Sequence, residues 1–313
     1  MTLAADPSAP SRSPGAPLLF PAEGWLAAAT ASLVPASLAL AALRGQAVDW
    51  AGFLPGLAPG AALVAIGLLA RARGSMDRLS LFLVASGIFI GFLAASSVFT
   101  FLLFPLPRPT VDAQLAAIDA WLGYDWPALV GWLAERPGLS RLLRAVYLSS
   151  IWQMFGVIVT LALLRRRADL HRFLAVGIAG LGITVAIWWL WPSVGPSAGA
   201  PLDPGIAARA SLLVDSRVGA ELMRMVRDGN PVITPGIITG VVAFPSFHMM
   251  MACMAVWYLR RTPLFWPALA VNALMVPATL AHGAHHLVDL IGAAALFGLL
   301  APVAARRIGP REA

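Results

Sequence analysis

The sequence predicts an all-α membrane protein that crosses the bilayer about eight times. Of its 313 residues, 59% are hydrophobic and only 12% are charged, whereas charged residues make up about a quarter of a typical soluble domain. The mean hydropathy is +0.79. Apolar stretches recur along the chain at about the 20-residue length that a helix needs to cross a bilayer. A bundle of membrane-spanning helices is therefore the expected fold.

Eight apolar stretches are the predicted spans. They lie near residues 24–43, 51–70, 79–104, 146–164, 173–191, 245–259, 264–281 and 287–304. The sixth stretch is short, so its helix is expected to begin a few residues earlier. Residues 1–23 lack a charged segment followed directly by an apolar one, which predicts a disordered leader rather than a cleaved signal. The rest divides into three N-terminal spans at 24–104, an outer segment at 105–145, a membrane core at 146–305 and a cytoplasmic tail at 306–313.

Arginine placement predicts the side of the membrane on which each loop lies. All 22 basic residues are Arg, and twelve of them form clusters after the second, fourth, sixth and eighth spans. The clusters are Arg71, Arg73 and Arg78; Arg165, Arg166, Arg167 and Arg172; Arg260 and Arg261; and Arg306, Arg307 and Arg311. Because alternating spans put all four clusters on one side, and short cytoplasmic loops collect positive charge, we assign that side and both termini to the cytoplasm. The net charge of +7 then reflects topology and gives no support to nucleic-acid binding.

Composition also indicates a cellular location. The chain is rich in Ala, Arg and Pro and has no Lys, which is typical of a GC-rich bacterial genome. We therefore expect an integral protein of the inner (cytoplasmic) membrane, with its outer side facing the periplasm.

The outer segment at 105–145 is predicted to form two short interfacial helices. Leucine and isoleucine recur near helical spacing in "VDAQLAAIDAWLGYDWPALVGWLAERPG", and Gly123 with Pro127 interrupts the pattern. The three tryptophans Trp121, Trp126 and Trp132 suit the headgroup level of a bilayer. An amphipathic cap on the bundle is the expected role. Substrate binding by an aspartate of this segment (Asp112, Asp119 or Asp125) is the alternative.

The stretch "VVAFPSFHMMMA" at 241–252 places polar groups where a membrane helix starts on the outer side. Pro245 suits a first helical turn, where its missing N–H is no loss. Free backbone N–H groups and the positive end of the helix dipole make such a terminus an anion site. Ser246 would add a hydroxyl donor, and His248 would add a proton donor that titrates near physiological pH.

Three of the five histidines lie in "TLAHGAHHLVDLIGA", at the outer end of the eighth span. His285 and Asp289 are four residues apart, so a helix would place them on one face. The carboxylate can then accept one ring N–H and leave the other imidazole nitrogen free as a nucleophile. For His282 and His286 a structural or supporting role is expected. His171, in an arginine-rich loop, is expected to be solvated or to face lipid headgroups.

"FPSFH" and "HxxxD", each opening a span on the same side, resemble the second and third motifs of the type 2 phosphatidic acid phosphatase superfamily. The finer resemblance is to bacterial members of its inositol phosphorylceramide synthase, or aureobasidin-resistance, branch. The similarity covers roughly spans four to eight, with weaker similarity in "DAQLAAIDAWLGYDWPAL" and "VRDGN". It implies that the core at 146–305 is catalytic and has a helical-bundle phosphatase fold.

The resemblance also implies roles for individual residues. His285 would attack phosphorus to form a phosphohistidine, and Asp289 would orient it. His248 would protonate the leaving oxygen, and Ser246 would hold a phosphoryl oxygen. The implied substrate is a lipid phosphate or phospholipid in the membrane, with an alcohol or lipid as a possible acceptor. No metal or other cofactor is implied, and no nucleic-acid partner is expected.

The sequence departs from the phosphatase pattern at its basic residues. Ala278 and Thr279 stand where phosphatases of the superfamily have Ser-Arg, and the first-motif lysine is missing because the chain has none. The inositol phosphotransferase branch shares the loss of that arginine. A positive group must still neutralise the phosphate. Arg227 and Arg224 are the candidates, because their segment, "GAELMRMVRDGN", runs into the Pro-Ser-x-His motif. The outer-side alternatives are Arg108, Arg141 and Arg144.

Two other functional classes stay open at this stage. One is a metalloenzyme that uses Asp289 with His248, His282, His285 or His286, although no Glu lies beside them to act as a base. The other is a transporter whose polar residues line a passage. That alternative predicts polar groups at mid-membrane depth, whereas here they cluster at helix ends on one side. Within the enzyme class, the pattern leaves open whether water or an alcohol accepts the phosphoryl group.

Overall fold

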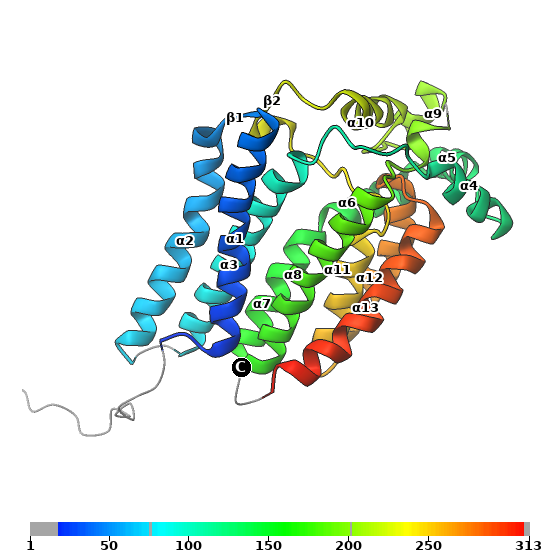
Figure 1. The fold of residues 1–313 in the computed structure, drawn as a ribbon. Coiled ribbons are helices and arrows are strands. Elements are labelled where there is room, and N and C mark those ends of the chain that lie inside the picture. The colour runs from blue at the N-terminus through cyan, green and yellow to red at the C-terminus, as the bar shows by residue number, and fades with distance from the viewer. Residues whose placement is uncertain (1–17, 75–76, 201, 310–313) are drawn as a thin grey trace, which may run out of the picture.

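The computed structural model describes residues 18–74, 77–200 and 202–309, and nearly all regular structure in these ranges is helical (Figure 1). Most of the predicted leader at 1–23 lies outside the described residues. Its last three residues belong to the first helix, which begins at Pro21. The predicted all-α fold is therefore confirmed for the part of the chain that is described.

The elements follow one another along the chain with mostly short connections. The helices are α1 (Pro21–Arg44), α2 (Trp50–Ala72), α3 (Asp77–Phe101), α4 (Asp112–Trp121), α5 (Trp126–Ala134), α6 (Pro137–Leu148), α7 (Ser150–Leu163), α8 (Arg167–Leu190), α9 (Pro204–Arg209), α10 (Ser216–Asp228), α11 (Phe247–Leu259), α12 (Phe265–His282) and α13 (Leu287–Arg307). Two short strands, β1 (Ala47–Val48) and β2 (Val232–Ile233), pair in parallel.

Helices occupy all eight predicted spans, but not all of them are long enough to cross a bilayer alone. Six helices are long and apolar enough: α1, α2, α3, α8, α12 and α13. The pair α6 and α7, bent by 50°, counts as a seventh candidate if it forms one span. The predicted sixth span is α11, which has only 13 residues. Among the described residues, this multi-pass membrane protein thus has six or seven candidate spans by length and composition, where eight were predicted.

The three N-terminal helices pack together beside the rest of the bundle. α2 packs along α3, and a Cβ atom at Gly87 would lie only 2.6 Å from the carbonyl oxygen of Gly60. The two helices can approach this closely only because neither residue has a side chain. α3 in turn packs on α7 and α8, which joins the N-terminal helices to the remaining bundle.

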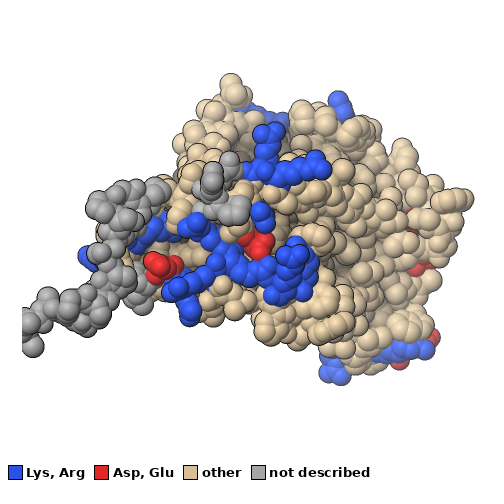
Figure 2. Space-filling model, turned by 90° about the horizontal axis from the view of Figure 1, so that it is seen from below, with Lys and Arg blue, Asp and Glu red and all other residues tan. Residues whose placement is uncertain are grey.

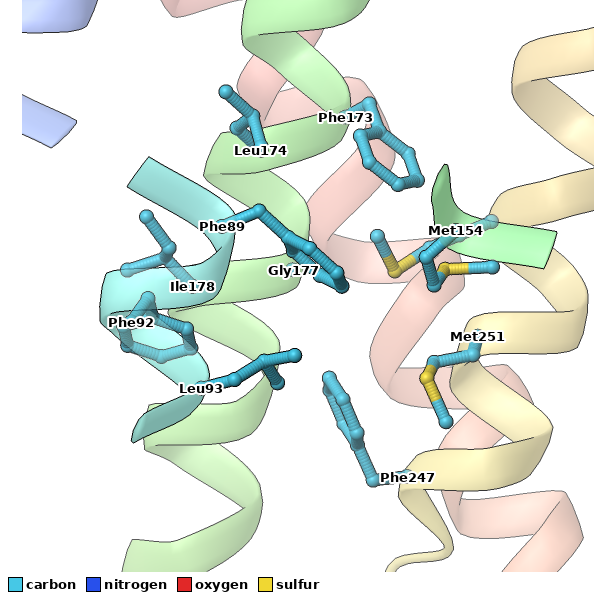
Figure 3. Close-up of a pocket in the computed structure, with 11 residues that line it drawn as sticks. Phe89, Phe92, Leu93, Met154, Phe173, Leu174, Gly177, Ile178, Phe247 and Met251 are labelled. Carbon is cyan, nitrogen blue, oxygen red and sulfur yellow. The ribbon is translucent and has the colours of Figure 1, made fainter. Parts of the chain in front are cut away.

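The main core surrounds α11, which packs on α7, α8, α12 and α13. Met250 and Met254 of α11 are 0% and 1% exposed and lie against Gly180 and Gly177 of α8. Beside them, a small cavity of about 20 Å³ lies between α3, α7, α8 and α11 (Figure 3). Its lining is entirely apolar. The short helix α11 is therefore held on several sides, and its N-terminal end has a defined position.

One end of the bundle carries the arginine-rich helix ends, and Figure 2 shows their side chains gathered on that face. Arg71 lies in the last turn of α2, Arg166 caps α8, Arg260 caps α11, and Arg306 lies in the last turn of α13. The starts of α11 and α13 lie at the opposite end (Figure 1). The two histidine motifs and the arginine clusters therefore lie at opposite ends of the bundle.

A buried charge cluster joins four helices, α1, α2, α3 and α8, at the arginine end. Arg71 donates two hydrogen bonds to Glu23 of α1, at 2.5 and 2.9 Å, and one to the Ser80 hydroxyl of α3 at 2.9 Å. His171 of α8 is 1% exposed, with Nε2 3.4 Å from Glu23 Oε1. The expectation that His171 is solvated is wrong, because the packing of α8 against α1 turns this ring inward toward the carboxylate.

The opposite end is covered by the outer segments. α4 and α5 form two helices as predicted, separated by Gly123 with φ of +78°. Trp121 and Trp132 are exposed, whereas Trp126 is 2% exposed and packs among small side chains that include Ala210 and Ala284. The prediction of a headgroup position is therefore wrong for Trp126, which holds α5 onto the turn before α13.

We expect Glu23→Gln to destabilise the protein, because it leaves the Arg71 guanidinium buried without its charged partner. Losing one member of a buried pair costs about 3 kcal/mol or more, which is roughly a 5–10 °C fall in thermal midpoint. The measurement is thermal unfolding in detergent. Glu221→Gln, which breaks the exposed Arg224 pair, is the matched control and should leave the midpoint unchanged. Equal shifts in the two variants would contradict the prediction.

Candidate active site

The Pro-Ser-x-His and His-x-x-x-Asp motifs meet at the end of the bundle opposite the arginine clusters. The backbone N–H of Ser246, at the start of α11, donates to the carbonyl oxygen of Asp289 in the first turn of α13 at 3.1 Å. The Ser246 hydroxyl lies 3.3 Å from His285 Nε2. Residues 39 positions apart in the chain thus share one buried site.

The local start of α11 differs from the predicted one. The helix begins at Phe247 with Ser246 as its N-cap, so Pro245 precedes the helix instead of lying in its first turn. The Ser246 hydroxyl accepts the backbone N–H of Met249 at 3.4 Å, as serine caps commonly do. A Cβ at Gly292 of α13 would lie 2.9 Å from the Phe244 ring, so the glycine lets the segment before Ser246 approach α13.

His285 is held by the carboxylate of Asp289, four residues later. Its Nδ1 lies 3.0 Å from Asp289 Oδ2, and both side chains are nearly inaccessible to solvent. The same oxygen accepts the backbone N–H of His286 at 2.9 Å. An ionised carboxylate can only accept hydrogen bonds, so this network assigns the ring proton to Nδ1. Nε2 then carries the lone pair and faces the Ser246 hydroxyl, which can donate to it.

His248 lies across the site from His285. The two imidazole centroids are 6.5 Å apart. The ring of Tyr147, in α6, stacks on His248 with centroids 4.2 Å apart, and its hydroxyl lies 3.4 Å from Nδ1. His248 is half-buried. An aromatic neighbour thus holds this imidazole, which is close enough to His285 for both rings to contact one phosphoryl group.

His286 connects the turn before α13 to the outer helix α4. Its Nδ1–H donates to Asp119 Oδ2 at 2.8 Å, and Nε2 lies 3.5 Å from Asp112 Oδ1. Asp119 also accepts the backbone N–H of Val288 at 3.2 Å. Burial disfavours a charged imidazole, but the contact with Asp112 and the neighbouring carboxylates raise the pKa of His286 above its ordinary 6.5. The buried imidazole of His286 therefore links two aspartates of α4 to the turn that carries His285.

Asp112 extends the same network to the loop after α8. Its carboxylate accepts the Ser193 hydroxyl at 2.8 Å and the backbone N–H of Gly195 at 2.9 Å. Burial opposes its ionisation, but the hydrogen bonds from His286 and the loop lower the pKa of Asp112. Gly195 has φ of +87°, and a Cβ there would lie 2.1 Å from the carbonyl oxygen of Ala284. Only glycine allows this loop to pack on the turn beside His285.

Tyr124, between α4 and α5, supports the backbone of the same turn. Its hydroxyl lies 3.3 Å from the carbonyl oxygen of His285 and donates to it. Burial and the nearby carboxylates raise the pKa of Tyr124, so the hydroxyl stays protonated and can serve as this donor. The outer segment thus contacts the backbone of His285 as well as the side chain of His286.

His282 and the two replaced motif positions lie below the site. His282 Nε2 is 2.9 Å from the carbonyl oxygen of Ser140 in α6, to which it donates. Ala278 and Thr279, where phosphatases of this type have Ser-Arg, are both 0% exposed. The Thr279 hydroxyl is buried without a hydrogen-bond partner. No guanidinium could occupy position 279 without displacing this packing.

The candidate phosphate-binding arginines of α10 pair with acidic residues of their own helix. Arg227 donates to Asp228 at 2.7 and 2.8 Å and is largely exposed. Arg224 donates to Glu221 at 2.7 and 2.9 Å, and to the backbone of Gly229. Within the described ranges, no hydrogen bond or ion pair joins either arginine to the histidines. Their role in binding phosphate stays a prediction.

Sequence patterns alone missed several residues that build the site. Tyr147 and Tyr124 belong to elements interpreted as a span and an outer cap, and neither lies in a motif. Asp112 and Asp119, the alternative substrate ligands, bind His286 instead. Asp125 caps α5 by accepting the Ala128 N–H. The rarity of tyrosine, with three in the chain, is the one available signal for the two tyrosines.

In the described residues, no group of three or more His, Cys, Asp or Glu side chains is arranged to hold a metal ion.

A family model described as the PAP2 superfamily matches residues 113–303, which is more than half of the chain. The chain belongs to the PAP2 superfamily. The matched range begins in α4 and ends in α13, so it includes both histidine motifs and Asp119. The comparisons with curated proteins and with solved structures gave no match. Membership supports an enzyme of the lipid-phosphatase type that acts on a lipid phosphate in a membrane.

We expect the ion pairs of His286 to make stability depend on pH. Because its folded pKa is raised, their contribution is fully present below pH about 6.5 and is lost as the pH rises through the folded pKa. The pKa of Asp112 is lowered in the folded state. Its contribution to the free energy of unfolding is therefore present above its unfolded pKa of about 3.9 and is lost as the pH falls through its folded pKa. The measurement is the thermal midpoint of wild type and His286→Gln against pH. The difference between them should be largest near pH 6 and shrink on the alkaline side. A constant difference would exclude titration of His286 as the cause.

Proposed function

We propose that the protein transfers a phosphoryl-containing group from a lipid-linked phosphate ester through a phosphohistidine on His285, without a metal ion. The observation that carries this proposal is the geometry of His285. Asp289 holds its Nδ1, and its Nε2 faces a hydroxyl donor with a second imidazole 6.5 Å away between ring centroids. Covalent phosphoryl transfer requires a nucleophile, a carboxylate that orients it and an acid, all within reach of one phosphorus atom.

In the first step, Nε2 of His285 attacks phosphorus as the ester P–O bond breaks. The departing oxygen takes a proton from His248, which is charged while the phosphate anion lies beside it and ends neutral. The imidazole of His285 becomes positive while the N–P bond forms, and the buried carboxylate of Asp289 stabilises that charge. The Ser246 hydroxyl turns from Nε2 to a phosphoryl oxygen.

In the second step, neutral His248 takes a proton from an acceptor hydroxyl, and the acceptor oxygen attacks phosphorus. The N–P bond breaks, and its electron pair returns to Nε2 of His285. Water as acceptor makes the reaction a hydrolysis, whereas an alcohol or lipid hydroxyl makes it a transfer. The same two imidazoles serve both outcomes, because only the hydroxyl compound differs.

Two features support a headgroup transferase of the inositolphosphotransferase-like branch over a simple phosphatase. The first is the loss of the third-motif arginine, since the buried Ala278 and Thr279 fill its place. The second is the absence of the first-motif lysine from a chain without lysine. A site with fewer fixed cations suits a phosphodiester, which carries less charge than a phosphomonoester. α11 begins beside the site, so the positive end of its helix dipole would supply part of the stabilisation.

Arg227 and Arg224 remain the proposed phosphate ligands. Each would have to leave its present carboxylate partner to bind the substrate. Exposed ion pairs contribute little free energy, so this exchange costs little. Arg144 is the alternative, because it lies one helical turn before Tyr147 on α6 and interacts electrostatically with His282.

We place this site on the periplasmic face of the inner membrane, with both termini in the cytoplasm. The support is the separation of the arginine clusters from the histidine motifs, which lie at opposite ends of the bundle. Because positive loops stay in the cytoplasm, the histidines then face the other side. Labelling of single-cysteine variants in intact cells tests this orientation.

The first experiment compares substrates in detergent with EDTA present. The purified protein is incubated with labelled phosphatidic acid, a prenyl diphosphate or phosphatidylinositol, with and without a ceramide or diacylglycerol acceptor. Acceptor-dependent product with little free phosphate would identify a transferase. Free phosphate without acceptor would identify a phosphatase. Loss of turnover in EDTA, restored by a metal, would contradict the proposal.

We expect His285→Ala and His248→Ala to reduce turnover by roughly 10³-fold or more, because each removes one partner of a chemical step. Asp289→Asn should reduce it by about 10²-fold or more, because it loses the charge that stabilises the imidazolium. All three variants should keep the wild-type elution profile in detergent. Asp125→Asn is the matched control, because asparagine also caps a helix and Asp125 lies outside the site. The readout is initial rate, with acid-labile label on the protein as the trapped intermediate. Retained activity in His285→Ala would overturn the mechanism.

A further inference from the structure

Tyr147, in the last turn of α6, contacts one imidazole of the candidate site and lies close to the other. Its ring stacks on His248, with the two planes 19° apart and the centroids 4.2 Å apart. It also approaches His285 across Gly283. A Cβ atom on Gly283 would lie 2.9 Å from Tyr147 Cε2 and 2.7 Å from His285 Cδ2. A residue outside both histidine motifs therefore touches the surroundings of both rings.

Position 283 has to be small for this arrangement to form. The φ of Gly283 is −85°, which any residue can adopt, so the requirement is for space rather than for backbone freedom. A side chain there would collide with the rings of Tyr147 and His285, and with the carbonyl oxygen of Thr279 at 2.7 Å. The absence of a side chain at Gly283 thus determines how closely the tyrosine approaches the turn before α13.

The helix that carries Tyr147 is held by contacts outside the pair of rings. His282, the last residue of α12, donates from Nε2 to the carbonyl oxygen of Ser140 in α6 at 2.9 Å. The Ser140 hydroxyl in turn donates to the carbonyl oxygen of Ala210. α6 packs along α12, and Ser140 lies about two helical turns before Tyr147. The tyrosine ring thus meets His248 from a helix whose position α12 fixes.

The Tyr147 hydroxyl lies 3.4 Å from Nδ1 of His248. Among the described residues, no other side chain is hydrogen-bonded to that ring. Hydrogen bonds between catalytic groups are often long before the substrate binds. In the proposed mechanism, His248 gives up and recovers one proton at the nitrogen that reaches the substrate. The proton on Nδ1 then has to stay in place, and the tyrosine oxygen is positioned to accept it.

The two imidazoles consequently have partners of different charge. Nδ1 of His285 faces the carboxylate of Asp289, whereas Nδ1 of His248 faces a neutral hydroxyl. A carboxylate strongly stabilises an imidazolium, which suits the ring that becomes positive when it binds phosphorus. A hydroxyl orients a ring with much less stabilisation of its charge. His248 is therefore held in place and still releases its proton readily, as an acid must.

We propose that Tyr147 is the positioning residue for His248. Its ring sets the orientation of that imidazole and its distance from His285, and its hydroxyl keeps the second ring proton on Nδ1. Only the other nitrogen then exchanges a proton with the substrate. The inference rests on the proposed function and adds to it a partner for the acid, supplied by a helix that carries neither motif. The hydroxyl matters most when the leaving oxygen needs a proton.

Nitrogen NMR tests the role of the hydroxyl without any turnover. The full chain is labelled with isotopic histidine and studied in detergent at alkaline pH, and the His248 signals are assigned by their loss in His248→Gln. We expect neutral His248 of the wild type to carry its proton on Nδ1. In Tyr147→Phe, which keeps the stacked ring and loses the oxygen, the proton should move in part to Nε2. A proton on Nε2 in the wild type, or an unchanged tautomer in Tyr147→Phe, would overturn the proposal.

Leaving-group dependence tests the same role in turnover. The substrates are hexadecyl phosphate, whose alkoxide needs a proton, and hexadecyl-nitrophenyl phosphate, whose nitrophenolate departs without one. Each has a single ester bond, so the leaving oxygen is defined. A general acid contributes about 10²- to 10⁴-fold. We expect Tyr147→Phe to lower kcat on the alkyl ester by about tenfold or more, with KM unchanged, and to leave the aryl ester nearly at the wild-type rate. An equal loss on both esters would indicate a structural role and overturn the proposal.

A single added methyl group tests the spacing of the rings. Gly283→Ala places a Cβ between Tyr147 and His285, whereas Gly298→Ala places the same atom on α13 where nothing lies within 4 Å. We expect Gly283→Ala to lower kcat on both esters by about tenfold or more, because a misplacement of about 1 Å can cost roughly 10²-fold. Gly298→Ala should match the wild type. Tyr147→Leu, which removes the stacked ring without filling position 283, should also lose activity on both esters. Wild-type kcat in Tyr147→Leu would overturn the spacing role.

The two kinds of measurement separate failure of this inference from failure of the proposed function. A His248 tautomer that depends on the hydroxyl, in a protein that turns over no phosphate ester, would support the assignment of Tyr147 and contradict the proposed function. Turnover that requires His285, together with an equal loss on both esters in Tyr147→Phe, would support the proposed function and overturn the assignment.

Discussion

The buried hydrogen bond between His285 and Asp289 is the interaction on which the site depends. One carboxylate oxygen holds the imidazole Nδ1 and the His286 N–H, and the Asp289 carbonyl receives the N–H of Ser246. The same residue therefore fixes a tautomer, caps α13 and joins α13 to α11. A buried carboxylate without such partners would cost several kcal/mol. The start of α13 thus has little freedom to adopt another arrangement, and His285, the proposed nucleophile, is held in one position.

Around this bond the structure adds an outer ring of support drawn from segments that carry no motif. The aspartates of α4 hold His286, Tyr124 holds the backbone of His285, and the Gly195 loop packs against the same turn. These contacts explain why two short helices and a proline-rich loop cover one end of a membrane bundle. They cover the end of the bundle at which the two histidine motifs meet.

Some residues of the site and the core could be placed from the sequence, and others could not. His285 and Asp289 could be paired in advance, because a spacing of four residues defines one face of any helix. The all-α membrane fold was predictable because hydropathy depends on composition alone. His171 and Trp126 were predicted wrongly, since the side chain of each is buried by a helix distant in sequence. α11 begins later than predicted, at Phe247, because Pro245 fits both a first helical turn and the residue before a serine cap.

The sequence by itself determined the class of protein, the helical segments, the separation of arginine from histidine along the chain and the residue types of the catalytic motifs. These properties follow from local composition and periodicity, which do not depend on how the helices pack. Only the tertiary structure decided that Ser246 lies against His285, that Tyr147 stacks on His248, and that Asp112 and Asp119 bind His286. Such contacts join residues far apart in the chain, and they form because buried polar groups must find partners and apolar helices must pack.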